Sequence, residues 1–375
     1  MTEARIAVIG LGTAGAMALW RLARRGVAVD GYEQFGVGHP RGASAGQTRR
    51  FSAVSQSDPQ NTPLALEAIT LWRELEAESG RQLLHLNGGL VIGPEGSPSL
   101  QAAKASAADY QLEHEVLGAD ELRRSYPQHL VRDEDEAVHD SVSGFLRPEA
   151  AIVSAVQQAL RHGARVHEQA EVTEIAPDGA GVRVEVGGAT RRYDAVVVAP
   201  GAWASRLVPG PGGQVAARKL FQAWFVPAEL ADYHPDRFPV FERVGDVQCY
   251  GFPSVDGATV KVGVYTVDHP LVADPDEPGP GIDEGRVALL RETVSTYLPG
   301  LHPELVMTTQ HLEGYSPDKH AILGGVAPGV VAACGFSGSG FKFAPVIGDV
   351  AASLAAGTAD DRDITHWSPE RFSQD

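Results

Sequence analysis

The pattern of apolar and polar positions at the start of the chain predicts a βαβ unit. Residues 5–9 (RIAVI) form a short apolar run that ends at Gly10, as a buried parallel strand does. Residues 14–25 carry apolar side chains at helical spacing with arginines late in the segment, and Gly26 follows as a stop signal. Residues 27–32 then predict the second strand.

The remainder of the chain contains two kinds of pattern. Helices are predicted at 63–78, 149–161, 286–297 and 346–356, and the polar stretch 99–138 is expected to be helical with a charged loop at 132–136. Short strands are predicted at 83–86, 89–92, 164–166 and 194–199, and within 171–186 and 321–343. Residues 215–265 alternate as antiparallel strands do, and the acidic, Pro/Gly-rich stretch 273–283 predicts a loop.

These patterns predict an α/β fold in which a second domain interrupts a nucleotide-binding domain. Segments 1–80, 145–210 and 315–375 have the character of a Rossmann-type nucleotide-binding domain. Segments 81–144 and 211–314 are expected to form a second, inserted α+β domain with a mostly antiparallel sheet. About two domains of roughly 150 residues each fit the length of 375 residues.

Composition narrows the classes of protein that fit. The formal net charge of -17 repels phosphate backbones, so no nucleic-acid partner is expected. No apolar run approaches a membrane span, and the N-terminal segment is interpreted as a strand and not as a signal peptide. Two cysteines, Cys249 and Cys334, cannot supply a disulfide framework, so a cytoplasmic location is expected. No metal site is expected, because the histidines are scattered; four are interpreted as surface residues, namely His114, His129, His139 and His162.

The segment Gly10-Leu11-Gly12-Thr13-Ala14-Gly15 lies between the first predicted strand and helix. In a dinucleotide site the first glycine permits the tight turn, the second lets the backbone approach a pyrophosphate, and the third allows close helix packing. Glu33 ends the second strand, where an acid accepts hydrogen bonds from the ribose. This order favours dinucleotide binding over a structural glycine turn, although the motif alone does not separate FAD from NAD.

Several ordered motifs carry a resemblance to one flavoprotein family. They are Gly10–Gly15, Gly46-Gln47-Thr48-Arg49, Pro200-Gly201-Ala202-Trp203, Tyr250-Gly251-Phe252-Pro253 with Lys261, and Gly335-Phe336-Ser337-Gly338-Ser339-Gly340-Phe341-Lys342. Over nearly its whole length the chain resembles the monomeric sarcosine oxidase and N-methyltryptophan oxidase family, within the D-amino-acid-oxidase-like flavoproteins. The resemblance implies FAD as cofactor, and a substrate domain whose mixed sheet roofs the flavin.

The resemblance also assigns roles to individual side chains. Lys261, in a strand otherwise made of valines, matches a lysine that lies over the flavin and activates oxygen; a solvated strand lysine is the alternative. Arg49 matches a residue that tunes the charge around the flavin; the alternative is that Arg49 and Arg50 form a surface pair that interacts with acids. Lys342 is expected to help hold a substrate carboxylate, against a snorkelling lysine. Tyr250 matches a pocket tyrosine, with core packing as the alternative.

Further FAD contacts are implied by the resemblance, with tight-turn structure as the alternative at the glycines. Val172 matches the strand contact on the adenine side. The expected cofactor contacts are Gly10, Gly12, Thr13, Ala14, Gly15, Glu33, Gln34, Ser44, Thr48, Arg49, Val172, Gly201, Trp203, His311, Gly338, Ser339, Gly340, Phe341 and Lys342.

Three pocket positions depart from the family pattern. Ser52 stands where sarcosine-type members have the arginine that clamps the carboxylate, and Arg50 is expected to point elsewhere if the segment is extended. Tyr265 stands at a pocket histidine position and Ala45 at a loop histidine position. Because a bidentate arginine recognises a carboxylate best, its loss argues against sarcosine and for a larger or less acidic amine.

The position at which the family attaches its flavin covalently also differs in this chain. A cysteine nine residues before the histidine of Asp318-Lys319-His320 would form it, and here His311 occupies that position. The usual thioether cannot form, so noncovalent FAD is favoured over a histidyl link through His311.

The resemblance implies oxidation of a C–N bond of a secondary or N-methylated amine or amino acid to an imine, with O2 reduced to H2O2. A flavin-dependent dehydrogenase or tailoring enzyme acting on a bulky amine is the alternative. A binding protein without catalysis fits less well, because the cationic residues Arg49, Lys261 and Lys342 are retained. An NADPH-dependent hydroxylase fits less well because the GFSGSGFK loop does not resemble the motif of that class. The expected partners are a small amine and O2, with no membrane, in a monomer or small homo-oligomer.

Overall fold

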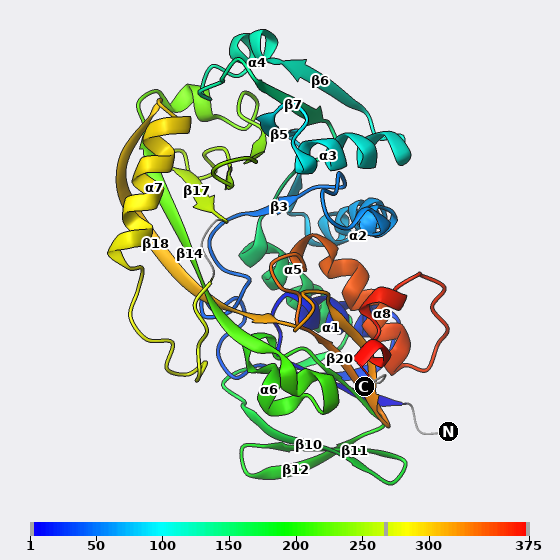
Figure 1. Cartoon of the computed structure of the whole chain (residues 1–375). Coiled ribbons are helices and arrows are strands. Elements are labelled where there is room, and N and C mark those ends of the chain that lie inside the picture. Colours follow the sequence, from blue (N-terminus) through cyan, green and yellow to red (C-terminus); the bar gives the residue numbers. More distant parts are fainter. Residues whose placement is uncertain (1–3, 266–268, 373–375) are drawn as a thin grey trace.

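The computed structural model of the chain describes residues 4–265 and 269–372 (Figure 1). Residues 1–3 and 373–375, at the ends of the predicted FAD-binding segments, and residues 266–268 of the predicted substrate segment lie outside the described residues.

A six-stranded sheet forms the nucleotide-binding part of the fold. Its strand order is β19 (Ile322–Ala327), β20 (Val330–Cys334), β13 (Ala195–Val198), β1 (Arg5–Ile9), β2 (Ala28–Tyr32) and β9 (Arg165–His167). Neighbouring strands run parallel except β19, which pairs antiparallel with β20. Apolar runs such as those of β1 and β13 suit this sheet, because both of its faces are covered.

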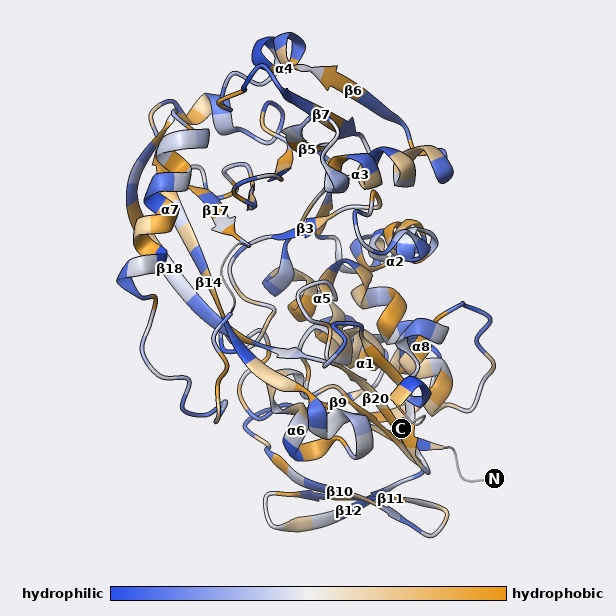
Figure 2. Ribbon diagram, in the orientation of Figure 1, coloured by the Kyte–Doolittle hydropathy of each residue, from blue (hydrophilic) through white to orange (hydrophobic). Residues whose placement is uncertain are grey.

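Helices pack against this sheet and against one another around a continuous core. They are α1 (Thr13–Arg24), α2 (Thr62–Ser79), α5 (Pro148–Arg161) and α8 (Ala344–Ala355). Gly348 of α8 permits the close approach to α1, since a Cβ there would lie 2.4 Å from the Cβ of Met17. Figure 2 shows hydrophobic colours gathered at α5, α8 and β20, whereas α4 (Ala119–Ser125) is largely hydrophilic.

A second, eight-stranded sheet lies beside the first sheet and its helices (Figure 1). Its order is β18 (Leu301–Tyr315), β14 (Ala216–Pro227), β17 (Val260–Val264), β16 (Cys249–Gly251), β15 (Val240–Arg243), β5 (Gly89–Pro94), β7 (Asp135–Asp140) and β6 (His114–Gly118). All of its pairs are antiparallel except β15 with β5. Helix α7 (Glu284–Tyr297) packs on β18 and β17, and α3 (Pro98–Asp109) packs on β5 and β7.

Two three-stranded sheets complete the fold. One consists of β10 (Val172–Asp178), β11 (Gly181–Val186) and β12 (Ala189–Tyr193), and it shares a core with β1 and β13. The other consists of β3 (Arg49–Phe51), β8 (Gly144–Leu146) and β4 (Leu84–His85). The short helix α6 (Ala204–Leu207) follows β13, and none of the described helices is long and apolar enough to cross a membrane.

The predicted α/β class, with a parallel nucleotide-binding sheet and a mostly antiparallel second sheet, is confirmed. The prediction of helix across 99–138 is wrong in part, because β6 and β7 interrupt it and Asp135 and Glu136 belong to β7 and not to a loop. These strands extend the edge beyond β5, and their ladder hydrogen bonds outweigh the polar local composition.

The prediction that His129 is a surface residue is also wrong. Its imidazole is 5% exposed and stacks on Phe238 at 5.3 Å between ring centroids, with Phe241 edge-on at 4.7 Å. Burial, and secondarily the charge of Arg243, lowers the pKa of His129 to about 3, so the ring packs as a neutral aromatic group.

Candidate active site

A cavity of about 740 Å³ is lined by residues of both large sheets. This volume lies within the range of small-molecule and cofactor sites. Every residue predicted to contact the cofactor or substrate lines it, except Gly15. The cavity extends from the glycine turn and Glu33 at one end to Tyr250, Tyr265 and Lys342 at the other.

The glycine turn between β1 and α1 is shaped for close approach by a ligand. Gly10 adopts a φ of +82°, and a Cβ there would lie 2.5 Å from the Ala199 carbonyl oxygen. A Cβ on Gly15 would lie 1.8 Å from the Gly10 oxygen, so Gly15 serves helix packing and not the cavity wall. A Cβ on Gly12 would have only the Ser44 hydroxyl near it, at 3.7 Å. No side chain caps the N-terminus of α1, which leaves its first N–H groups available to a phosphate.

Glu33 closes this end of the cavity. One of its oxygens accepts a hydrogen bond from the Leu11 N–H at 2.9 Å, and the other accepts one from the Phe35 N–H at 3.0 Å. Thr13 and Ser44 share a hydroxyl hydrogen bond of 3.0 Å beside the turn. The residues present therefore fit an adenine dinucleotide, with the acid at the position where it can accept from a ribose hydroxyl.

Lys261 is fixed against the loop that contains Gly46 and Thr48. Its ammonium donates to the carbonyl oxygens of Gly46 at 2.9 Å and Thr48 at 2.7 Å, and lies 4.3 Å from the centre of the Phe252 ring. Only 4% of Lys261 is exposed, so the solvated alternative is excluded. Burial, with a smaller effect of the Arg49 charge, holds the pKa of Lys261 well below its ordinary value.

Glu149 and Trp224 hold the same loop from outside. The N–H groups of Gly46 and Gln47 donate to one oxygen of Glu149 at 2.6 and 3.0 Å. The Trp224 indole donates to the Gln47 side chain at 3.0 Å. These hydrogen bonds hold the loop where Thr48 and Arg49 line the cavity.

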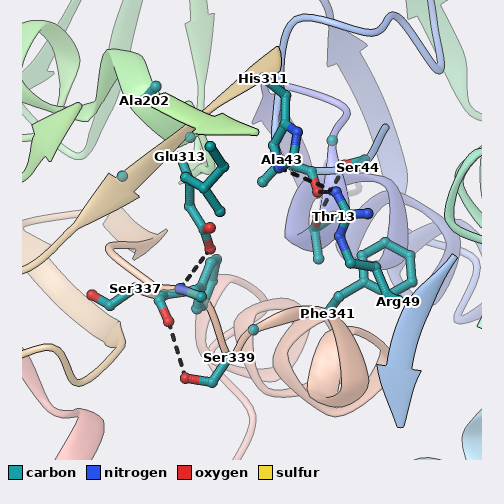
Figure 3. Close-up of a pocket in the computed structure, with 18 of the residues that line it drawn as sticks. Thr13, Ala43, Ser44, Arg49, Ala202, His311, Glu313, Ser337, Ser339 and Phe341 are labelled. Carbon is teal, nitrogen blue, oxygen red and sulfur yellow. Dashed lines mark hydrogen bonds between the residues drawn. The ribbon is translucent and has the colours of Figure 1, made fainter. Parts of the chain in front are cut away.

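Arg49 lies inside the protein without an acidic hydrogen-bond partner among the described residues. Its guanidinium donates to the carbonyl oxygens of Thr48, at 2.8 Å, and of Ala43 (Figure 3). One of its nitrogens lies 3.4 Å from Nε2 of His311. The alternative of a surface arginine paired with acids is therefore excluded.

His311 is a neutral imidazole at the cavity wall. It is 3% exposed, and burial, followed by the charges of Arg49 and Lys261, holds its pKa well below the ordinary histidine value. Within the described part of the chain its Nδ1 has no hydrogen-bond partner. A buried ring nitrogen without a hydrogen-bond partner lowers the stability of a folded protein. We therefore interpret this face of the cavity as a place for a ligand.

The far end of the cavity is aromatic and charged. The rings of Tyr250 and Tyr265 lie 4.6 Å apart, and Tyr265 is 44% exposed. The Lys342 ammonium lies 4.8 Å from the centre of the Phe343 ring. Burial, followed by the charge of Arg50, lowers the pKa of Lys342 to about 8.

Arg50 does not point away from the site, as the extended segment had suggested. It lines the cavity and makes an ion pair with Glu242 of β15, which also accepts a hydrogen bond from Gln56 at 2.9 Å. Strand β3 has only three residues, and the attraction of Glu242 brings the guanidinium into the pocket. Ser52 uses its own hydroxyl internally, donating to the Val54 carbonyl at 2.8 Å.

Glu171, Glu242 and Glu313 line the cavity and were not predicted. Glu313 follows His311 by two residues in β18, so strand alternation already placed both side chains on one face. Glu242 gave no such signal, because β15 reaches the site through its parallel pairing with β5. Gln222 of β14 and Tyr315 of β18 also line the cavity and were missed.

Comparison with known proteins gives a consistent result. Residues 5–354 match the model of the family described as FAD dependent oxidoreductase. The monomeric sarcosine oxidase of Streptomyces avermitilis is 32% identical over 98% of this chain and 97% of its own length. The N-methyl-L-tryptophan oxidase of Salmonella dublin is 31% identical, covering 98% of each chain.

Solved structures share the fold at lower identity. The open form of NikD, described as an unusual amino acid oxidase essential for nikkomycin biosynthesis, superposes with a TM-score of 0.85 at 23% identity, over 97% of this chain and 96% of that one. The glycine oxidase of Geobacillus kaustophilus gives a TM-score of 0.81 at 21% identity, over 98% and 99%. The predicted family resemblance is confirmed, and the chain belongs to the FAD dependent oxidoreductase family.

Proposed function

We propose that this FAD-dependent oxidoreductase oxidises a C–N bond of a secondary or N-methylated amine or amino acid to an imine and reduces O2 to H2O2. The observation that carries the proposal is one continuous cavity with a dinucleotide turn at one end and a buried lysine, two tyrosines and Lys342 at the other. The names of the relatives, which are sarcosine and N-methyltryptophan oxidases, support the substrate class.

In this proposal the glycine turn, the N-terminus of α1 and Glu33 would hold FAD, which would supply the acceptor for the hydride equivalent from the carbon next to nitrogen. Lys261 provides the positive charge that favours oxygen reduction, because it is buried and held by two carbonyl oxygens. Arg49 tunes the charge of the ring's surroundings, and Tyr250 and Tyr265 pack against the amine. Lys342 attracts any carboxylate that the amine carries.

A flavin-dependent dehydrogenase or tailoring enzyme for a bulky amine is the second candidate. It is favoured by Ser52 and Tyr265, which line the cavity at the positions of the arginine and the pocket histidine of sarcosine-type members. Ala45, at the loop histidine position, does not line the cavity. A peroxide-release screen of the FAD-loaded protein against N-methyl amines, cyclic imino acids and primary amines tests the proposal. Peroxide formed in proportion to amine consumed supports the oxidase; amine consumption without peroxide supports the dehydrogenase.

The FAD is proposed to be noncovalent, and His311 to face it as a neutral ring. After acid precipitation the yellow colour should remain in the supernatant, whereas a yellow pellet would contradict this and favour a histidyl link.

We further propose segments 1–80, 145–210 and 315–375 as the FAD-binding domain, with 81–144 and 211–314 as the substrate domain. A cytoplasmic monomer or small homo-oligomer is proposed with them, since Cys249 and Cys334 are both buried and unpaired.

A further inference from the structure

Glu313 is a buried carboxylate that the proposed function leaves without a role. It lies on β18, is 9% exposed and lines the cavity. One oxygen accepts a hydrogen bond from the Gly338 N–H at 2.7 Å (Figure 3), and the other has no hydrogen bond within the described residues. It makes no ion pair with a described lysine, arginine or histidine. Burying a carboxylate with so little support is costly unless the site uses it.

The electrostatics around Glu313 leave room for one more positive charge. Burial raises its pKa above the ordinary glutamate value, and the charge of Arg49 offsets this only in part. A cationic group that enters the cavity would stabilise the carboxylate and would be held by it. Glu242, the other carboxylate of the far end, is already occupied by Arg50 and Gln56.

An amine substrate brings such a positive charge, and its nitrogen must lose that charge before it is oxidised. A secondary amine has a pKa near that of lysine, about 10, so at neutral pH it arrives as an ammonium ion. Oxidation of its C–N bond needs the nitrogen lone pair, so one proton must leave the nitrogen first. The acceptor must lie within hydrogen-bond reach of the bound amine and be unprotonated.

We propose that Glu313 is the residue that binds the substrate ammonium and accepts its proton. An N–H bond of the ammonium breaks and an O–H bond forms on the free oxygen of Glu313, which leaves a neutral amine and a neutral carboxylic acid. No electrons are transferred in this step. The inference rests on the proposed function, because it supplies the deprotonated amine that the oxidation consumes.

Other groups that share the cavity wall with Glu313 are less suited to this role. Arg49 and Lys261 are cationic donors, and Lys261 is engaged with two carbonyl oxygens. Burial lowers the pKa of His311, so its ring is neutral and offers no negative charge to an ammonium. Burial raises the pKa of Tyr250 and that of Tyr315, so both stay protonated. The titratable and charged groups around this region are Arg49 of β3, Arg218 of β14 (the cross-strand partner of Glu313), Tyr250 of β16, Lys261 of β17, His311 and Tyr315 of β18, and His269.

The test compares Glu313→Gln with Glu304→Gln, which changes an exposed residue of the same strand that pairs with Arg291. Both FAD-loaded variants and the unchanged protein are mixed anaerobically with an N-methyl amine, and the rate of flavin reduction is followed between about pH 6 and pH 10. Near pH 7, Glu313→Gln should react about 10²- to 10³-fold more slowly. The difference in rate between Glu313→Gln and the unchanged protein should disappear as the pH approaches the pKa of the free amine. Glu304→Gln should keep the pH profile of the unchanged protein.

The outcomes separate the inference from the proposed function. A Glu313→Gln protein with the original profile, or one slowed equally at every pH, overturns the role of Glu313 and leaves the proposed function standing. If no amine reduces the flavin of the unchanged protein at any pH, the proposed function fails and this inference fails with it. Should Glu313→Gln not retain FAD, Glu313→Asp keeps an acid at the site and should show a slower rate with the original pH dependence; loss of that dependence would overturn the role.

Discussion

Replacement of Glu242 by glutamine tests how this site chooses among amines. Glu242 forms an ion pair with Arg50, and their side chains are 15% and 21% exposed. The pair therefore neutralises an arginine that lines the cavity. Glutamine keeps the shape and can still accept from Gln56, but it leaves the guanidinium free to meet a substrate carboxylate.

The size of the effect follows from the bond that Arg50 would gain. A hydrogen bond to a charged group contributes about 1.5–3 kcal/mol, which corresponds to a factor of about 10 to 100 in affinity. Glu242→Gln should raise kcat/KM for an N-methyl amino acid by that factor relative to an N-methyl amine of similar size without a carboxylate. Peroxide release measures both, with Glu304→Gln as the matched control. An unchanged ratio in a variant that holds FAD normally would refute the reasoning.

Three further predictions concern the lysines and the glycine turn. Lys261→Met should slow reoxidation of the reduced flavin by O2 about 10²- to 10³-fold while anaerobic reduction by amine changes little; equal losses in rapid-mixing experiments would remove its assigned role. Gly15→Ala should lower the free energy of unfolding by about 1–3 kcal/mol or more, because its Cβ would lie 1.8 Å from the Gly10 oxygen, whereas Gly213→Ala, with no atom near that Cβ, should have little effect in thermal unfolding. KM for an N-methyl amino acid should rise as the pH passes about 8, since Lys342 then loses its proton, and Lys342→Met should show a high KM without that rise; a rise that persists in the variant would contradict this.

Local signals made much of the fold predictable. The apolar runs of β1 and β13 and the glycine stop after α1 each carry their own physical cause, and the structure has them within a residue or two. Strands β6 and β7 could not be read in the same way. Both mix charged with apolar residues, and the pairing of β7 with β5 and of β6 with β7 decides their conformation.

The site shows the same division. Gly10 and Glu33 lie in a motif whose spacing implies their chemistry, whereas the role of Lys261 was implied by the family resemblance. All three line the cavity. Glu242 and Arg50 meet only because β15 and β3 approach each other in space, 192 residues apart in sequence. Glu313 lies two residues after His311, which the sequence did single out. Its proposed role depends on the burial of its side chain, which no sequence pattern shows.

The most direct test of the account is anaerobic titration of the FAD-loaded protein with N-methyl amines, followed by the flavin absorbance. We expect the purified protein to bind FAD, to lose its yellow colour with at least one amine, and to regain it with release of peroxide when air is admitted. A protein that cannot take up FAD, or whose flavin stays oxidised with every amine, would contradict the central claim.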